Sequence, residues 1–192
     1  MKKRVLTIVA VFIILLVGLH IFKKTNTNYT VGQEIDHFNG VPVYYNGTVG
    51  NVEGRQVTQD GYNLGLKYQC VEFVKRYYYD HLDHKMPDSY GHAKDFFDRN
   101  TKDGEINKQR ALSQFTNPST TKPKTNDLLV YGPTLLNKYG HVAIISKVTA
   151  TEIEIIQQNP GPYGNTREHY DLVFKNDKWY INHKQILGWL RK

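Results

Sequence analysis

The chain has 192 residues, of which 25 are basic and 18 acidic, and its formal net charge is +7 at pH 7. A chain of this length predicts one domain with additional segments. Five basic and no acidic residues fall in residues 1–24, which leaves 20 basic and 18 acidic residues, a net charge of +2, in the rest. Because the basicity is concentrated at one end, the composition does not favour a nucleic-acid partner, and we predict none.

The N-terminal segment predicts a membrane anchor. Residues 5–22 carry no formal charge and would form a helix about 27 Å long, close to the roughly 30 Å hydrocarbon core of a bilayer. The more positive flank precedes this run, so the rest of the chain is expected outside the membrane. We therefore expect residues 1–24 to form the signal-anchor of a single-pass cell-membrane protein whose folded domain is extracytoplasmic. A cleaved signal, and hence a secreted protein, is the alternative, although the sequence shows no Ala-x-Ala site.

The remainder divides into a polar stalk at residues 25–39 and a folded domain at residues 40–192. Within this domain, residues 69–83 have the strongest helical pattern, with apolar side chains along one stripe, and a shorter helix is predicted at residues 89–100. Short apolar or alternating segments predict strands at 41–47, 128–132, 141–148, 152–159, 168–174, 179–181 and 185–190. Helices followed by several strands indicate an α+β domain.

The single cysteine, Cys70, cannot form an intrachain disulfide. It falls at the start of the predicted helix 69–83, where free backbone N–H groups and the helix dipole favour a thiolate. The thiolate is the nucleophilic form of cysteine, and the same N–H groups could stabilise an oxyanion. The alternative interpretation is a small buried residue of the apolar stripe.

A nucleophilic cysteine needs a base, and His141 is the best-placed histidine because it opens the apolar strand 141–148. If this strand and the next form a hairpin centred on residue 150, His141 faces Asn159 and shares a face with Gln157. A slip of one residue would remove this relationship. On that condition, the pattern predicts polar side chains that orient the imidazole.

Several motifs of the domain resemble the CHAP family, the cysteine- and histidine-dependent amidohydrolases/peptidases. They read "YQCVEFVKR", "GHVAIIS", "IIQQN" and "ILGWL", and the likeness extends from about residue 40 to residue 189. Within the family, the likeness is greatest to the amidase domain of glutathionylspermidine synthetase/amidase. The resemblance implies a papain-like α+β fold, in which a helix carrying the nucleophile packs on an antiparallel sheet carrying the histidine.

By this resemblance, Cys70 is the nucleophile and His141 the general base and acid. The third residue of the family is usually a glutamate in a Glu-x-Asn triplet, which here reads Gln-Gln-Asn at residues 157–159. Asn159 matches the triplet, whereas Gln157 departs from it. We expect Gln157 to orient His141 without adding charge, as asparagine does in papain-like proteases, with Asn159 sharing the task. An inactive family member that serves as a binding module is the alternative.

Three further residues are candidates for contacts with the substrate. Gln69 precedes the nucleophile and could donate its amide to the oxyanion, or could serve only as a helix cap. Tyr68 and Tyr139 are candidates for lining the cleft, in a chain with 14 tyrosines.

The implied chemistry is the hydrolysis of an amide bond through a thioester, without a metal or an organic cofactor. The histidines show no metal-ligand spacing with the cysteine. An extracytoplasmic domain of a bacterium would meet peptidoglycan peptides first, and we expect these as the substrate. A peptide–polyamine amide of the glutathionylspermidine type is the alternative.

Overall fold

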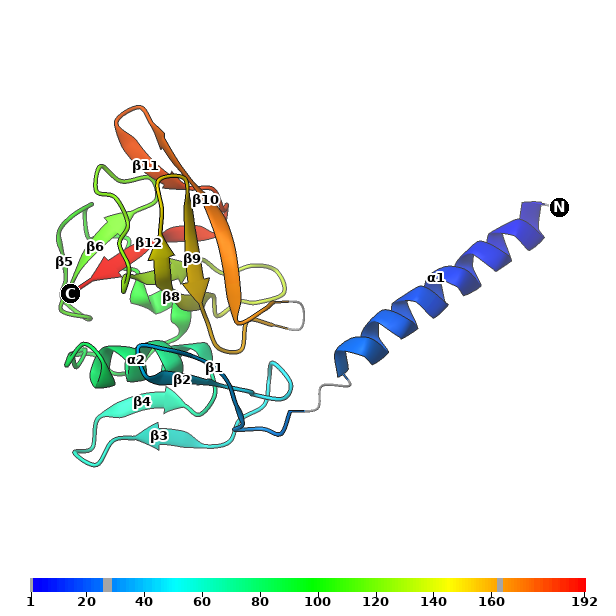
Figure 1. Cartoon of the computed structure of the whole chain (residues 1–192), viewed down its shortest axis with the longest axis horizontal. Helices are drawn as coiled ribbons and strands as arrows, with labels where there is room; N and C mark the ends of the chain where they lie inside the picture. Colours follow the sequence, from blue (N-terminus) through cyan, green and yellow to red (C-terminus); the bar gives the residue numbers. More distant parts are fainter. Residues whose placement is uncertain (1, 26–28, 162–163) are drawn as a thin grey trace. The chain divides into compact units, whose positions relative to one another are not determined.

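The structure is a computed structural model that describes residues 2–25, 29–161 and 164–192. It divides into two compact units, Met1–Thr30 and Val31–Lys192. The predicted boundaries of the anchor, the stalk and the folded domain stay predictions. The second unit carries all the predicted site residues (Figure 1).

The first unit contains one helix, α1 (Lys2–Thr25). Among the residues that the structure describes, no helix combines the length and the apolar character needed to cross a membrane. The predicted transmembrane helix was therefore wrong, and with it the predicted membrane contact and the single-pass, extracytoplasmic localisation.

The second unit is built around an eight-stranded sheet with the order β11-β10-β9-β8-β7-β12-β6-β5. Two further strand pairs, β1–β2 and β3–β4, complete its β-structure among the described residues. All registered pairs are antiparallel. The strands are β1 (Glu34–Phe38), β2 (Val41–Tyr44), β3 (Arg55–Val57), β4 (Asn63–Leu66), β5 (Ile106–Asn107), β6 (Leu112–Thr116), β7 (Leu128–Tyr131), β8 (His141–Val148), β9 (Glu152–Ile156), β10 (Arg167–Lys175), β11 (Lys178–Ile181) and β12 (Ile186–Arg191).

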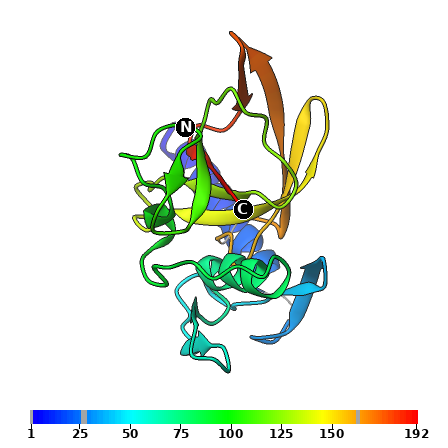
Figure 2. The ribbon, with the colours of Figure 1, turned by 90° about the vertical axis from the view of Figure 1, so that its left-hand side faces the viewer.

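Helix α2 (Cys70–Asp80) confirms the helix predicted at residues 69–83. Figures 1 and 2 show it between the large sheet and the β3–β4 pair. The helix predicted at residues 89–100 is only a short 3-10 turn, η1 (Ala93–Phe96). The Arg110 guanidinium donates hydrogen bonds to the backbone carbonyls of Asp88, Tyr90 and Asp95. These carbonyls therefore have partners without an α-helix.

The large sheet has a hydrophobic core on each face. The side chains of β8 alternate between the two: Val142 and Ile144 belong to the core that includes α2, and Ala143 and Ile145 to the other. This alternation explains the apolar character of the whole strand, because neither of its faces meets solvent. Helix α2 contributes its apolar stripe to the first core, which fixes the start of the helix against the sheet.

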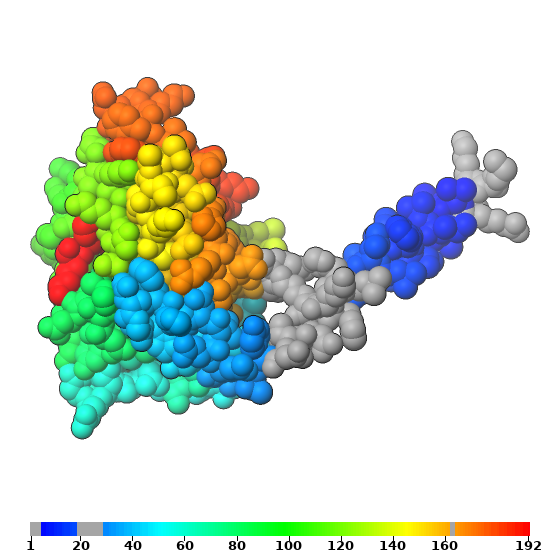
Figure 3. All heavy atoms as spheres, in the orientation of Figure 1, coloured from blue at the N-terminus to red at the C-terminus, as the bar shows by residue number. Residues whose placement is uncertain are grey.

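The N-terminal strand pair packs on the same core as α2, through Val41 and Val43 of β2. Figure 3 shows the blue surface of β1–β2 next to the orange surface of β10. Arg167 on β10 donates from Nε to Asp36 on β1 at 2.9 Å and from Nη1 to Glu154 on β9 at 2.8 Å. The β1–β2 pair is thereby tied to the sheet by a charge-assisted contact.

Candidate active site

Cys70 is the first residue of α2, at the end of the helix where backbone N–H groups have no intrahelical partner. Burial raises the pKa of the Cys70 thiol to about 11, against the opposing effect of the nearby backbone N–H groups of Val142, Val71 and Cys70 itself. The resting side chain is therefore a thiol at neutral pH. The helix dipole, which favours a thiolate, does not overcome the loss of hydration at this site.

His141 is the first residue of β8 and is half-buried. The backbone N–H of Val142 lies near Cys70, so the start of α2 meets the start of β8, beside this histidine. Burial lowers the pKa of His141 to about 4, against the opposing effects of the Gln157 hydrogen bond and the Glu168 charge. The imidazole is thus neutral at neutral pH and can accept a proton.

Gln157 holds the imidazole in one tautomer. Its Oε1 lies 2.8 Å from His141 Nε2, and its own Nε2 donates to the carbonyl of Asn165 at 2.9 Å. The second bond fixes which end of the amide faces the ring. Since a carbonyl oxygen only accepts, His141 Nε2 carries the hydrogen and Nδ1 keeps its lone pair. The predicted neighbourhood of His141 and Gln157 is confirmed as a contact.

The structure does not bring Asn159 to His141. Asn159 has a φ of 51° and turns away after the end of β9. Its Nδ2 donates to Gln69 Oε1 at 2.7 Å and to the carbonyl of Val49 at 3.0 Å. On the β9 side of His141 the strand ends at Ile156, and Asn159 contacts Gln69, the residue before the candidate nucleophile. On the β7 side His141 pairs with Tyr131.

The register of the β8–β9 hairpin explains why Gln157 lies beside His141, as predicted. Ile144 pairs with Ile156 and Ile145 with Ile155, as a hairpin centred on residue 150 requires. A bulge at Ser146 then shifts the pairs on the turn side, Lys147 with Glu154 and Val148 with Ile153, by one residue. The predicted register is correct at the end that carries His141, which is the end that decides where Gln157 lies.

Gln69 turns its amide toward the loop that precedes β3. Its Nε2 donates to the carbonyl of Asn51 at 2.8 Å and, more weakly, to that of Val49 at 3.4 Å. It makes no side-chain cap to α2. In this conformation both amide hydrogens of Gln69 have backbone acceptors, so its amide has no free N–H to offer to an oxyanion.

The two candidate tyrosines lie in different surroundings. Tyr68 has a φ of 64° and packs edge-on against Tyr44, with ring centroids 5.6 Å apart. Tyr139 is 49% exposed and lies 4.7 Å from the His92 ring. Tyr139 is therefore open to a ligand near His141, whereas Tyr68 supports the turn that leads into α2.

Sequence reasoning missed the role of Gln158, the middle residue of the triplet. Its fully buried side chain donates to Glu72 Oε2 at 2.8 Å and to the carbonyl of Gln69 at 3.0 Å, and it accepts from the N–H of Tyr44 at 2.7 Å. Glu72 in turn accepts from Arg76 Nε at 2.6 Å. This network ties the segment after β9 to α2 and to β2. A glutamine just after an apolar strand was the available signal.

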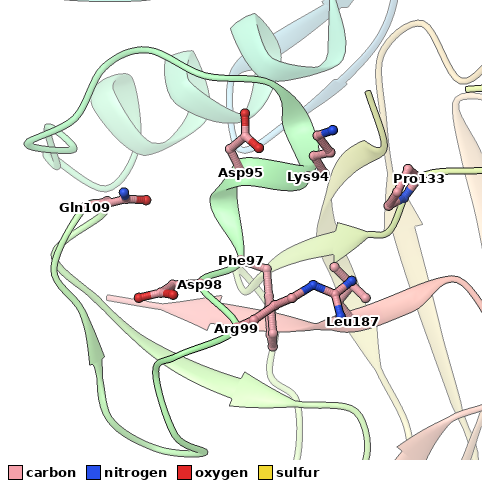
Figure 4. Close-up of a pocket in the computed structure, with 8 residues that line it drawn as sticks. All are labelled: Lys94, Asp95, Phe97, Asp98, Arg99, Gln109, Pro133 and Leu187. Carbon is pink, nitrogen blue, oxygen red and sulfur yellow. The ribbon is translucent and has the colours of Figure 1, made fainter. Parts of the chain in front are cut away.

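A separate pocket of about 580 Å³ lies beside η1 (Figure 4). Its lining includes Lys94 and Asp95 of η1, Leu187 of β12, and Arg99, which follows η1. None of the predicted site residues lines it. The N–H of Lys94 donates to the carbonyl of Tyr139 at 2.9 Å, so one wall of this pocket shares the segment that precedes His141. Across the described residues, no group of three or more His, Cys, Asp or Glu side chains could hold a metal ion.

Comparison with known proteins places this arrangement in a family of amidohydrolases and peptidases. The CHAP domain matches residues 59–159, just over half of the chain and the span from the approach to Cys70 through the Gln-Gln-Asn triplet. The chain belongs to the CHAP family.

Two curated relatives match the same region. A trypanothione synthetase of Crithidia fasciculata is 29% identical over 119 residues, which is 62% of this chain and 18% of the relative. A glutathionylspermidine synthase of the same organism is 30% identical over 103 residues, 51% of this chain and 14% of the relative. The chain therefore spans less than a fifth of either relative.

Two solved structures also match, "The crystal structure of Ly7917" and the same protein "with the hydrolyzing product of MDP". Each is 26% identical, covers 39% of this chain and 30% of its own, and has a TM-score of 0.28.

Proposed function

We propose that the chain is a thiol-dependent amidohydrolase in which Cys70 is the nucleophile, His141 the base and acid, and Gln157 the orienting residue. Membership of the CHAP family supports amide hydrolysis as the reaction class. The observation that carries the assignment is the bond from His141 Nε2 to Gln157 Oε1, because it leaves Nδ1 free to accept a proton at the start of α2.

The reaction begins from a neutral pair, because the thiol has a raised pKa and the imidazole a lowered one. His141 Nδ1 removes the thiol proton as the sulfur of Cys70 forms its bond to the carbonyl carbon. Backbone N–H groups at the start of α2 stabilise the oxyanion that results. The imidazolium then gives its proton to the departing amine, the C–N bond breaks, and a thioester remains.

Water completes the cycle. His141 takes a proton from the water, whose oxygen attacks the thioester carbon. The C–S bond then breaks, the acid leaves, and the imidazolium returns its proton to the sulfur. Gln157 keeps the ring in place through both halves without contributing charge, so the transient imidazolium is less stabilised than beside a carboxylate.

The substrate that we favour is the amide between a peptide and a polyamine. Both curated relatives are named for such conjugates. The expectation of peptidoglycan peptides depended on an extracytoplasmic location, which was inferred from the membrane anchor that the structure does not support. Peptidoglycan peptides remain the second substrate class to test, because they also contain amides within the chemistry of the family.

One experiment tests both substrates. The full chain and its Cys70→Ser variant are incubated with glutathionylspermidine and, separately, with peptidoglycan fragments, and the products are identified by mass. We expect release of the polyamine by the wild type and no release by the variant. Release of new amino groups from the fragments alone would transfer the assignment to the second substrate. A folded wild type that cleaves neither would favour the alternative of a non-catalytic binding module.

A further inference from the structure

The carboxylate of Glu168 lies on the same face of the sheet as His141 and Gln157, on the strand next to β9. Glu168 on β10 pairs with Ile155 of β9 and is half-buried. Its Oε2 accepts the hydroxyl of Tyr170 at 2.7 Å. Residues two apart on a strand share a face, so Glu168 and Tyr170 both point to the side of the sheet that contains His141 and Gln157.

Two tyrosines link Glu168 to the imidazole of His141 through successive contacts. Tyr131 donates its hydroxyl to that of Tyr170 at 3.3 Å. Tyr131 is directly opposite His141 in the β7–β8 ladder, and the two ring centroids are 5.6 Å apart. The chain of contacts from Glu168 therefore ends at the ring of the proposed base.

A second path reaches the other side of the same ring. Glu168 Oε1 accepts the backbone N–H of Asn165 at 3.4 Å. The carbonyl of Asn165 accepts Gln157 Nε2, and Gln157 Oε1 accepts from His141. The same carboxylate thus contacts the loop that orients the Gln157 amide and the tyrosines that pack beside His141.

We propose that Glu168 is a positioning residue that supplies, from β10, the negative charge that Gln157 does not supply, and that it stabilises His141 in its protonated form during hydrolysis. This inference rests on the proposed function. No proton passes through the tyrosines: the proton moves between Cys70, His141 and the substrate, while the carboxylate keeps its charge. Its effect is electrostatic, and a half-buried site preserves it better than open solvent does.

The surroundings of the ring agree with this assignment. The charge of Glu168 raises the pKa of His141, whereas burial lowers it. Among the residues that the structure describes, the contacts place four other titratable groups around His141: Cys70 on α2, Tyr131 on β7, Tyr170 on β10 and His183 after β11, whose ring lies 5.5 Å from that of Tyr131. Burial lowers the pKa of His183, and it raises that of Cys70 and both tyrosines. At neutral pH all four of these groups are therefore uncharged.

The test compares Glu168→Gln with Asp171→Asn. Asp171 lies on the same strand and is exposed, so this control also removes one negative charge. Two quantities are measured: kcat and KM for the substrate that the wild type cleaves, and the midpoint of the His141 titration from its ring proton in NMR spectra. For Glu168→Gln we expect a lower midpoint and about ten-fold lower kcat, equivalent to about one pKa unit, with KM unchanged. Glu168→Asp should recover part of both, and Asp171→Asn should change neither.

The NMR titration separates this inference from the proposed function. An equal His141 midpoint in Glu168→Gln and Asp171→Asn would overturn the role of Glu168, whatever the activity. A wild type that cleaves no substrate would overturn the proposed function and with it the catalytic part of the role. If Glu168→Gln does not fold, Glu168→Asp decides, since it keeps the charge but draws it back from His141 by one methylene: a midpoint below that of the wild type supports the proposal and an unchanged one contradicts it.

Discussion

His141 Nε2 donates a hydrogen bond to Gln157 Oε1 at 2.8 Å, and the Gln157 amide is held in this orientation by its second bond, to Asn165. The imidazole is therefore oriented by a neutral group. A neutral acceptor fixes the tautomer as a carboxylate does, but it leaves the imidazolium without an adjacent opposite charge. The predictions below follow from this site and from the contacts that hold it.

Replacing Gln157 by glutamate should raise the pKa of His141 above its present value of about 4, because the new carboxylate accepts the same hydrogen bond and adds charge. We expect kcat to rise by about ten-fold for each unit of that shift. The control is Gln157→Leu, which removes the acceptor and should lower kcat. The measurement is steady-state hydrolysis with an NMR titration of His141. An unchanged titration in Gln157→Glu would contradict the orientation seen in the structure.

The pH dependence should show a wide plateau. Burial lowers the pKa of His141 to about 4 and raises that of Cys70 to about 11. Below the lower value His141 is protonated and cannot accept the thiol proton; above the upper value the pair has lost the proton that the leaving amine needs. We expect kcat/KM to be constant between about pH 6 and 9. A steep acid limb centred near pH 7 would show that His141 titrates as if it were exposed.

The buried pair of Glu72 and Arg76 should be essential to stability. Arg76→Ala leaves Glu72 buried with only the Gln158 amide as a side-chain donor, which costs about 3–5 kcal/mol in the free energy of unfolding. Lys85→Ala is the matched control, since it breaks the exposed pair with Asp60 and should hardly change stability. Urea unfolding measures both. Equal effects of the two variants would argue against the buried network.

The glycine that precedes His141 should not tolerate a side chain. Gly140 has a φ of 74°, and a Cβ there would lie 2.6 Å from the carbonyl oxygen of Tyr131. Gly104 has a φ of 85° but open space around it, so Gly104→Ala should cost only the backbone strain of about 1–2 kcal/mol. Gly140→Ala should cost more and also reduce kcat, because the start of β8 must move. Thermal unfolding and hydrolysis rates of the two variants check this.

The sequence predicted the placement of Cys70, His141 and Gln157 because helix starts and strand periodicity are local properties. It failed for Asn159, whose positive φ takes it out of the strand, and for Gln158, whose burial depends on a carboxylate 86 residues earlier. The expectation of a thiolate at Cys70 also failed, because the cost of burial depends on the packing of β8 against α2 and exceeds the favourable effect of the helix start.

The apolar N-terminal run shows a different limit. Hydropathy and flanking charge predicted a membrane anchor at residues 1–24, but no helix in the described part of the chain meets the requirements of a span. The inferred location had placed peptidoglycan first among the expected substrates. Without it, peptidoglycan peptides and the peptide–polyamine amide are both proposals that the hydrolysis experiment must separate.

The bulge at Ser146 gives the β8–β9 hairpin two halves that can change independently. The Ser146 hydroxyl donates to the carboxylate of Glu154 within the hairpin. The one-residue shift in pairing is confined to the turn side of Ser146 and does not affect the pair of Ile144 and Ile156. Residues inserted or deleted in the turn beyond the bulge should therefore leave the pairing near His141 intact. The turn is accordingly a suitable place to attach a fluorophore or an affinity tag, and a position where homologous chains can differ in length without losing the alignment of base and orienting residue.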